Sequence, residues 1–360
     1  MAAVDTEVVV IGAGMAGLAT AYELAQGGRD VTVLEQFAVG HRRGSSHGAS
    51  RVFRLSYPDA GWVRLAQDAL REWRRWEAET GGSLLRLTGS LDVGPHVPQN
   101  RGSLDACGVT SEVVAADAAM RRFGLRLDDG EPALFQPDAG VLSAARVLEH
   151  LGKAIRARGG RLAYESRVEQ LHIGQGVVRA DTPSGPVTGR AAVVAAGPWA
   201  GGILAPLGLA PPVTVTRETV AYLSVDRADE LPVLMCAGGP GVGDDRVVGT
   251  YALADAASTL KVGVHHTGPE ADPAADIAPD PVVAEWAVRW AADRLPGRRI
   301  SLARSETCHY TNTTDERFVL ERHGRVVVGS ACSGHAFKFA PVIGATLAGL
   351  AVDAVHDSPT

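Results

Sequence analysis

Aromatic residues make up only 5% of this 360-residue sequence, and its basic residues are scattered and form no tract. The 35 Lys and Arg residues are outnumbered by 41 Asp and Glu residues, which gives a formal net charge of −6. Single-stranded nucleic acids are bound by aromatic side chains in a basic groove, and anionic lipid surfaces by basic segments. The sequence therefore predicts neither a nucleic-acid partner nor a membrane partner.

Long apolar runs, metal-ligand patterns and cysteine pairs are also lacking. No stretch reaches the ~18 uninterrupted apolar residues of a membrane span, and residues 1–7 lack the basic segment that begins a signal peptide. The four cysteines (Cys107, Cys236, Cys308 and Cys332) lie far apart, and no CxxC or HExxH segment occurs. We expect reduced thiols in a cytoplasmic protein with no metal site.

What the sequence does contain is a globular mixture with 46% hydrophobic residues, long enough for about two domains. Strand patterns, glycine turns and helical spacing occur together in three separate pieces, at residues 7–35, 147–197 and 325–355. The intervening segments mix strand-like runs with loops and a helix expected over 281–295. Residues 238–243 and 270–281 are expected to be exposed loops.

This distribution predicts two domains built from interleaved segments. One is a nucleotide-binding domain, assembled from residues 1–83, 144–217 and 301–360. The other is a separate sheet-based domain that covers it, assembled from residues 84–143 and 218–300.

The sharpest local motif is Gly12-x-Gly14-x-x-Gly17, which follows an apolar strand over 7–11 and opens a helix. The first glycine permits the tight turn, the second lets a pyrophosphate approach the backbone, and the third lets helix and strand pack closely. Glu35 ends the next strand, where a carboxylate can accept hydrogen bonds from ribose hydroxyls and disfavours the 2′-phosphate of NADP. The complete unit predicts an adenine dinucleotide site.

The segment that follows favours FAD over NAD. An NAD enzyme of this size usually continues with alternating strands and helices through residue ~150. Here the polar, glycine-rich stretch from Gly44 to Arg54 comes next, and it can supply hydroxyls and guanidinium groups along an extended cofactor. An NAD-linked dehydrogenase and a non-catalytic flavin-binding protein remain the alternatives of another class.

Taken together, four segments resemble the FAD-dependent D-amino acid oxidase superfamily, most closely its branch of monomeric sarcosine oxidase and N-methyltryptophan oxidase. They are Val8–Glu35, Gly44–Tyr57, Leu260–Thr267 and Thr307–Gly344, and they occur in the family's order. The resemblance implies an α/β fold: a Rossmann-like FAD-binding domain assembled from discontinuous segments, plus an α+β, mixed-sheet substrate domain.

The resemblance also implies how FAD is held. Thr307 to Phe318 looks like the flavin-attachment segment, and Cys308 stands where the family joins its flavin through an 8α-S-cysteinyl bond. Its polar neighbours Glu306, His309 and Tyr310 fit a core strand poorly. The residues expected to contact FAD, besides Gly12, Gly14, Gly17 and Glu35, are Ser45, His47, Arg51, Cys308, Gly334, His335 and Lys338.

Roles at the substrate are implied in the same way. Lys261 matches the lysine over the flavin face where oxygen is reduced, because a fixed cation stabilises the developing negative charge. Arg54 and Lys338 match the pair that receives the substrate carboxylate. The residues expected beside the amine are His265, Tyr310 and Tyr251.

The function expected from this resemblance is oxidation of a secondary-amine amino acid, N-methyl or cyclic. The products would be an imine and hydrogen peroxide, and the enzyme would act as a monomer on an amino or imino acid and molecular oxygen. An alternative keeps the cofactor but desaturates a cyclic imino acid in two steps to an aromatic product. The peroxide released per substrate separates the two hypotheses, since the first predicts one and the second two.

Overall fold

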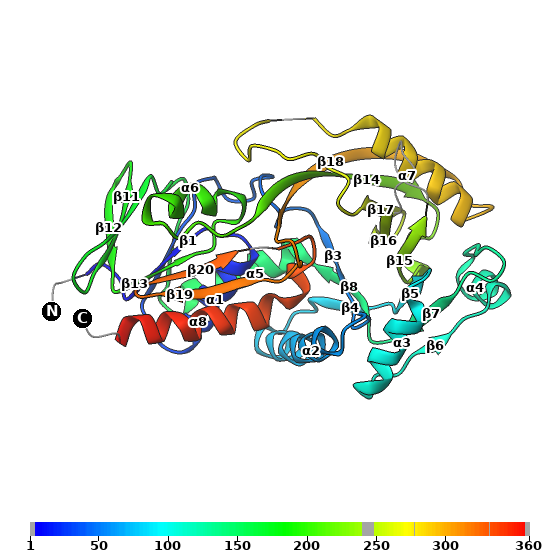
Figure 1. The fold of residues 1–360 in the computed structure, drawn as a ribbon, viewed down its shortest axis with the longest axis horizontal. Helices are drawn as coiled ribbons and strands as arrows, with labels where there is room; N and C mark the ends of the chain where they lie inside the picture. Colours follow the sequence, from blue (N-terminus) through cyan, green and yellow to red (C-terminus); the bar gives the residue numbers. More distant parts are fainter. Residues whose placement is uncertain (1–3, 240–247, 277, 331, 357–360) are drawn as a thin grey trace.

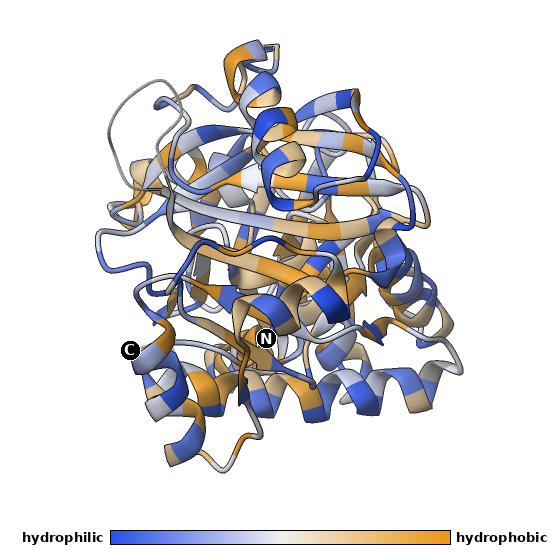
Figure 2. Cartoon of the chain, turned by 90° about the vertical axis from the view of Figure 1, so that its right-hand side faces the viewer, coloured by the Kyte–Doolittle hydropathy of each residue, from blue (hydrophilic) through white to orange (hydrophobic). Residues whose placement is uncertain are grey.

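The computed structural model describes residues 4–239, 248–276, 278–330 and 332–356. Its two largest sheets lie at opposite ends of the molecule, with a small sheet between them (Figure 1). Along the helices at the surface, hydrophobic and hydrophilic residues alternate, as expected for elements that bury one face (Figure 2).

The first large sheet has six strands, in the order β19-β20-β13-β1-β2-β9. All pair in parallel except β19, which is antiparallel to β20. Its central strands are buried apolar runs, as expected of a parallel sheet that is covered on both faces. The bounds are β1 Val8–Ile11, β2 Val31–Leu34, β9 Arg161–Ala163, β13 Ala191–Val194, β19 Val319–His323 and β20 Val326–Ser330.

Helices α1 (Met15–Gln26), α5 (Ala144–Ala157) and α8 (Ala340–His356) pack together on one face of this sheet. On the other face lie α6 (Ala200–Leu204) and the three-stranded antiparallel sheet of β10 (Gln170–Ile173), β11 (Val178–Thr182) and β12 (Gly185–Gly189). The stretch Ala336–His356, which contains α8, is long and apolar enough to span a membrane, but over half of it is buried. That burial is typical of a core helix.

The second large sheet has eight strands, in the order β18-β14-β17-β16-β15-β5-β7-β6, and only the β15–β5 pair is parallel. Helix α7 (Pro281–Arg294) covers one face, and the Asp280 carboxylate caps it by accepting from the Val282 N–H at 2.8 Å. The strands are β5 Ser90–Val93, β6 Glu112–Val113, β7 Ala133–Gln136, β14 Thr214–Val225, β15 Val233–Gly239, β16 Val248–Ala256, β17 Thr259–Val264 and β18 Ile300–Asn312.

A small antiparallel sheet connects the two large ones, in the order β3-β8-β4. Val52 on its first strand packs with Val233 and Leu253 of the eight-stranded sheet. Helix α2 (Ala60–Thr80) packs beside α8, and α3 (Val97–Ala106) and α4 (Ala116–Phe123) flank β6 and β7 (Figure 1). The small strands are β3 Ser50–Phe53, β4 Leu85–Leu87 and β8 Gly140–Ser143.

The expected α/β class with a second, mixed sheet is confirmed. Division into two domains stays a prediction, and two long strands cross its proposed boundaries. Residues 217 and 218 both lie in β14, and residues 300 and 301 both lie in β18, which pairs with β14. From Glu270 to Asp280 the described residues form turns and one isolated bridge, as expected of a loop. The other expected loop, 238–243, lies mostly outside the described residues.

Candidate active site

The turn between β1 and α1 requires its glycines. Gly12 has φ of +104°, and a Cβ atom there would lie 2.6 Å from the carbonyl oxygen of Ala195. A Cβ atom at Gly17 would overlap the carbonyl oxygen of Gly12. Gly14 lies beside the loop Ser46, whose Oγ accepts from the Met15 N–H at 2.9 Å. The glycines therefore allow the close packing that the motif predicts.

Glu35 is fixed at the carboxyl end of β2. Its side chain is 6% exposed, and its oxygens accept from the backbone N–H groups of Ala13 at 2.8 Å and Phe37 at 3.0 Å. These bonds place the carboxylate directly beside the glycine turn. Its role toward ribose stays a prediction.

A cavity of about 940 Å3 runs from this turn to the eight-stranded sheet. Its size is at the upper end of the range for small-molecule and cofactor sites. Every predicted site residue except Gly17 lines it: Gly12, Gly14, Glu35, Ser45, His47, Arg51, Arg54, Tyr251, Lys261, His265, Cys308, Tyr310, Gly334, His335 and Lys338. Residues predicted from distant segments are thus brought to one cavity.

The pairing register of the eight-stranded sheet explains which of its side chains face the cavity. Opposite residues in a pleated sheet share a face, and so do alternate residues of one strand. Tyr222 pairs with Lys261, Lys261 with Leu253, and Glu218 with Cys308, so all project from the cavity face. The residues between them, such as Val262, point to the opposite face and pack toward α7.

Cys308 is partly buried in β18, next to two buried residues, His309 and Tyr310. Glu306 is partly buried too, and both Glu306 and Cys308 line the cavity, so this stretch of the strand borders the cavity and does not lie in the core. Burial raises the pKa of the thiol to about 11, whereas Arg51 and Lys261 act to lower it.

The loop that begins at Gly44 is bonded to β18 beside this thiol. The Ser45 hydroxyl donates to the His309 carbonyl oxygen, and the His309 N–H donates to the Gly44 carbonyl oxygen at 3.3 Å. Arg51 then ties the loop together, because its Nη2 donates to the carbonyl oxygens of Ser45 at 2.6 Å and His47 at 2.5 Å. The predicted cofactor loop and the predicted attachment strand are therefore in direct contact.

Lys261 is 5% exposed, and its Nζ donates to the Ser50 carbonyl oxygen at 3.1 Å. Burial and, to a smaller extent, Arg51 lower its pKa to about 7, while Cys308 and Asp255 oppose the shift. The Ser50 hydroxyl donates to Asp255 Oδ1 at 2.5 Å, which fixes the segment that holds the lysine. The structure thus excludes an outward-pointing lysine in water.

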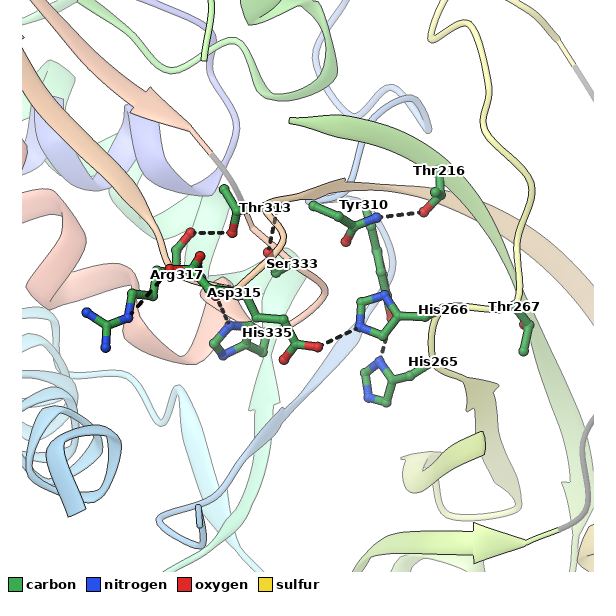
Figure 3. Close-up of polar contacts among 12 residues, drawn as sticks. Thr216, His265, His266, Thr267, Tyr310, Thr313, Asp315, Arg317, Ser333 and His335 are labelled. Carbon is green, nitrogen blue, oxygen red and sulfur yellow. Dashed lines mark hydrogen bonds and ion pairs between the residues drawn. The ribbon is translucent and has the colours of Figure 1, made fainter. Parts of the chain in front are cut away.

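Tyr310, His265 and Tyr251 form one group at the same end of the cavity. The Tyr310 hydroxyl lies 3.2 Å from His265 Nδ1 (Figure 3). The Tyr251 and His265 rings are 4.9 Å apart between centroids. Burial and the neighbouring His266 lower the pKa of His265 to about 3, and burial raises the pKa of Tyr310 well above its usual value. All three side chains are therefore uncharged near neutral pH.

Arg54 and Lys338 flank the ring of Tyr57. Lys338 Nζ donates to the Tyr57 hydroxyl at 3.0 Å and to the His335 carbonyl oxygen at 2.8 Å, and the Arg54 guanidinium carbon lies 4.1 Å from the ring centroid. Burial, and then Arg54, lower the pKa of Lys338 well below its usual value. Within the described ranges neither cation has a carboxylate at ion-pair distance, so both can bind an anionic ligand.

Two cavity histidines differ in their hydrogen bonding. His335 Nδ1 lies 3.2 Å from the Tyr57 hydroxyl, and its Nε2 lies 3.0 Å from the Glu316 carbonyl oxygen. His47 Nδ1 is buried without a hydrogen-bond partner in the part of the chain that the structure describes. A ligand in the cavity can supply that partner, and with the tight glycine turn this shows that the residues fit a dinucleotide cofactor.

Comparison with known proteins agrees with this fit. The sequence model of a family described as FAD dependent oxidoreductase matches residues 7–350. The chain belongs to this family.

Curated relatives cover nearly the whole chain. Human peroxisomal sarcosine oxidase is 33% identical over 362 residues, covering 95% of this chain and 90% of that protein. Monomeric sarcosine oxidase from Bacillus sp. (strain B-0618) is 27% identical, covering 96% and 92%. These matches confirm the predicted branch and the prediction of an FAD-dependent oxidoreductase.

Among solved structures, NikD, described as an unusual amino acid oxidase essential for nikkomycin biosynthesis, matches with a TM-score of 0.88. The identity is 28%, and the match covers 97% of this chain and 94% of that one. The fold of this FAD-dependent oxidoreductase is therefore shared along its full described length.

Sequence reasoning missed several side chains that surround the site of this FAD-dependent oxidoreductase. Tyr222, Arg304, Glu306 and Cys332 line the cavity, and Tyr57 contacts Lys338.

The lysine content of the sequence is a signal that could have marked part of the site. The chain has 3 lysines among its 35 basic residues, and Lys261 and Lys338 are buried in the cavity, so lysine in this arginine-rich sequence marks special positions.

Proposed function

We propose that this FAD-dependent oxidoreductase oxidises a secondary-amine amino acid, N-methyl or cyclic, to an imine, with oxygen as the final acceptor and hydrogen peroxide as the second product. The observation that carries the proposal is the convergence of three chemistries in one cavity. They are two basic side chains with no carboxylate at ion-pair distance among the described residues (Arg54 and Lys338), an uncharged group beside them (Tyr310 and His265), and a thiol next to Lys261. The sarcosine oxidase relatives support the same substrate class.

In this proposal the two cations bind the substrate carboxylate. Arg54 offers two parallel N–H donors and Lys338 a compact positive charge, so together they fix the position and rotation of the carboxylate. The amine then lies toward Tyr310, His265 and Tyr251. Because none of these side chains is charged near neutral pH, and two cations stand nearby, the pocket favours a neutral amine over an ammonium.

Bound FAD supplies the acceptor for the hydrogen and the two electrons that leave the amine carbon, and it passes the electrons to oxygen. For its attachment we propose a covalent bond through Cys308. The thiol lines the cavity, and although burial raises its pKa, Arg51 and Lys261 oppose that shift and would stabilise a thiolate when it forms. Lys261 is then a fixed cation beside the same part of the cavity, where oxygen acquires negative charge.

Two-step oxidation of a cyclic imino acid is the second candidate. Val52, Met235 and Leu253 form an apolar wall of the cavity, and an apolar wall suits a saturated ring better than an N-methyl group alone. The match to NikD, described as an unusual amino acid oxidase, is consistent with it. The first candidate yields one hydrogen peroxide per substrate and the second yields two.

Peroxide release tests the proposal. Purified yellow enzyme would be given N-methylglycine, proline and pipecolate, each matched with its counterpart lacking the carboxylate. We expect turnover of at least one amino acid and much slower turnover of its counterpart. Equal rates with and without the carboxylate, or a colourless protein that binds NADH, would refute the proposal. A monomeric state and a cytoplasmic location belong to the same proposal, and light scattering and cell fractionation test them.

A further inference from the structure

Three residues beside the end of the cavity that we assign to the substrate have a rare backbone conformation. His266, Glu316 and Ser333 are non-glycine residues with positive φ, of +57°, +59° and +39°. L-residues rarely adopt this region, and such conformations persist where surrounding contacts enforce them. His266 and Glu316 belong to different loops, the first after β17 and the second between β18 and β19. Their side chains form an ion pair, with 3.3 Å between His266 Nε2 and Glu316 Oε1 (Figure 3).

His266 is joined to the side of the pocket that we assign to the amine. It directly follows His265, and its ring meets that of Tyr310 edge-on at 5.7 Å between centroids. Glu218 holds the same loop from β14, because its Oε2 accepts from the N–H groups of Thr267 at 3.1 Å and Gly268 at 2.8 Å. The His266 side chain is therefore presented from a firmly held loop.

Glu316 is joined to the side that we assign to the carboxylate. Its carbonyl oxygen lies 3.0 Å from His335 Nε2, and His335 Nδ1 lies 3.2 Å from the Tyr57 hydroxyl. That hydroxyl and the His335 carbonyl oxygen both accept from Lys338 Nζ. The loop that carries Glu316 thus supports the lysine through two intermediate residues.

We propose that His266 and Glu316 form a clasp that positions these two sides of the pocket relative to each other and so tunes how tightly the enzyme binds the substrate carboxylate. Neither residue lines the cavity, so both act as positioning residues. The inference deepens the proposed function and rests on it for the identity of the carboxylate site.

The strength of the His266–Glu316 ion pair should depend on pH. Glu316, and more weakly Glu218, raise the pKa of His266, while His265, Tyr310 and His335 on the neighbouring elements stay uncharged near neutral pH. Below its raised pKa, His266 is charged and the clasp is closed. As the pH rises through that pKa the charge is lost, the ion pair weakens, and binding of the carboxylate weakens with it.

The test compares three variants with a matched control. His266→Gln removes the charge at every pH, His266→Lys keeps a charge at every pH, and Glu316→Gln removes the acceptor charge. The control Asp315→Asn changes the adjacent carboxylate, which pairs with Arg317 within the same loop, at 3.7 Å between Arg317 Nε and Asp315 Oδ2. It preserves the clasp while removing the same charge from the same loop.

The probe is methoxyacetate, the ether analogue of N-methylglycine, which has a carboxylate but no amine to titrate. Its Kd is read from the flavin spectrum between about pH 5.5 and 9, the range in which histidine changes charge. We expect His266→Gln and Glu316→Gln to raise the Kd about two- to five-fold at low pH, the size expected of a partly exposed ion pair. His266→Lys is expected to bind tightly up to the highest pH. Lys338 is present in all the variants, so the ratio of Kd values between variants at each pH isolates the clasp.

Hydrogen–deuterium exchange of residues 313–318 gives a readout that needs no substrate. Measured as protection relative to the intrinsic exchange rate at each pH, it should be higher at low pH in the wild type, low throughout in the Gln variants and high throughout in His266→Lys. If the Gln variants match the wild type and Asp315→Asn in both Kd and exchange at every pH, the clasp is refuted. If the wild type does not bind methoxyacetate, the proposed carboxylate site fails, and the exchange pattern still decides the clasp. Should Glu316→Gln not fold, the two His266 variants suffice.

Discussion

Replacing Lys261 with Met should separate the two half-reactions of the enzyme and reveal their pH dependence. Burial lowers the pKa of this lysine to about 7, so it is about 90% charged one pH unit below that value and about 10% charged one unit above. If its charge assists the reduction of oxygen, reoxidation in the wild type should slow about tenfold per pH unit above 7. In Lys261→Met the rate should not change with pH, and it should lie about 10²- to 10³-fold below the wild-type rate at pH 6, the usual cost of losing one preorganised electrostatic stabiliser.

Stopped-flow spectroscopy provides the assay. For the first half-reaction, enzyme that has been reduced chemically, in the absence of substrate, is mixed with oxygen at pH values from 6 to 9. For the second, reduction of the enzyme by substrate is measured separately in the absence of oxygen. We expect the second reaction to change much less, because no anion forms beside Lys261 in that step. Lys153→Met is the matched control, since it removes the same charge from an exposed lysine paired with Glu149 on α5. A flat wild-type profile, or equal slowing of both half-reactions in Lys261→Met, would refute the reasoning.

Three further predictions follow from the same geometry. Cys308→Ala should release its flavin on acid precipitation, whereas the wild-type pellet should stay yellow; a wild type that also releases intact flavin contradicts the covalent bond. Arg54→Met and Lys338→Met should each raise KM for amino-acid substrates about 10- to 100-fold, since each removes a charge-assisted hydrogen bond, and should leave turnover of carboxylate-free amines unchanged. Gly12→Ala should weaken FAD retention and lower Tm, because its Cβ atom would lie 2.6 Å from a carbonyl oxygen in a left-handed backbone; unchanged flavin content would contradict the tight turn.

The cofactor end of the cavity could be predicted from sequence because it is local. Strand, turn, helix and second strand follow one another between Val8 and Glu35, and the spacing of Gly12, Gly14 and Gly17 has a direct steric meaning. The structure shows the same order of elements, with the helix beginning at Met15, inside the glycine motif. Local geometry of this kind is encoded over fewer than thirty positions, so no knowledge of distant contacts was needed.

The substrate end could not be predicted in the same way because its geometry depends on strand register. Tyr222 shares a face with Lys261 only because β14 pairs with β17 in that register, and no spacing within either strand reveals this. Tyr57 reaches Lys338 across 281 positions of sequence, and the loops that carry His266 and Glu316 meet only in the folded chain. Resemblance to a family could supply positions there, but not the contacts that hold them.

The way in which the cavity holds its cations explains why they remain available to ligands. Arg51 and Lys261 donate to backbone carbonyl oxygens of Ser45, His47 and Ser50, and Lys338 donates to a carbonyl oxygen and a hydroxyl. A carbonyl oxygen accepts the hydrogen bond of a basic side chain and leaves its positive charge uncompensated, whereas a carboxylate accepts the hydrogen bond and also neutralises the charge.

Two partly buried cations outside the cavity do pair with carboxylates: Arg294 with Glu131 at 2.6 Å and Arg75 with Glu23 at 2.6 Å. Burying a cation against neutral oxygens destabilises the protein and lowers the pKa of a lysine, as seen at Lys261. Basic side chains held in this way in one cavity support the proposal that they bind anions from outside: a phosphate-bearing cofactor, a substrate carboxylate and oxygen as it is reduced.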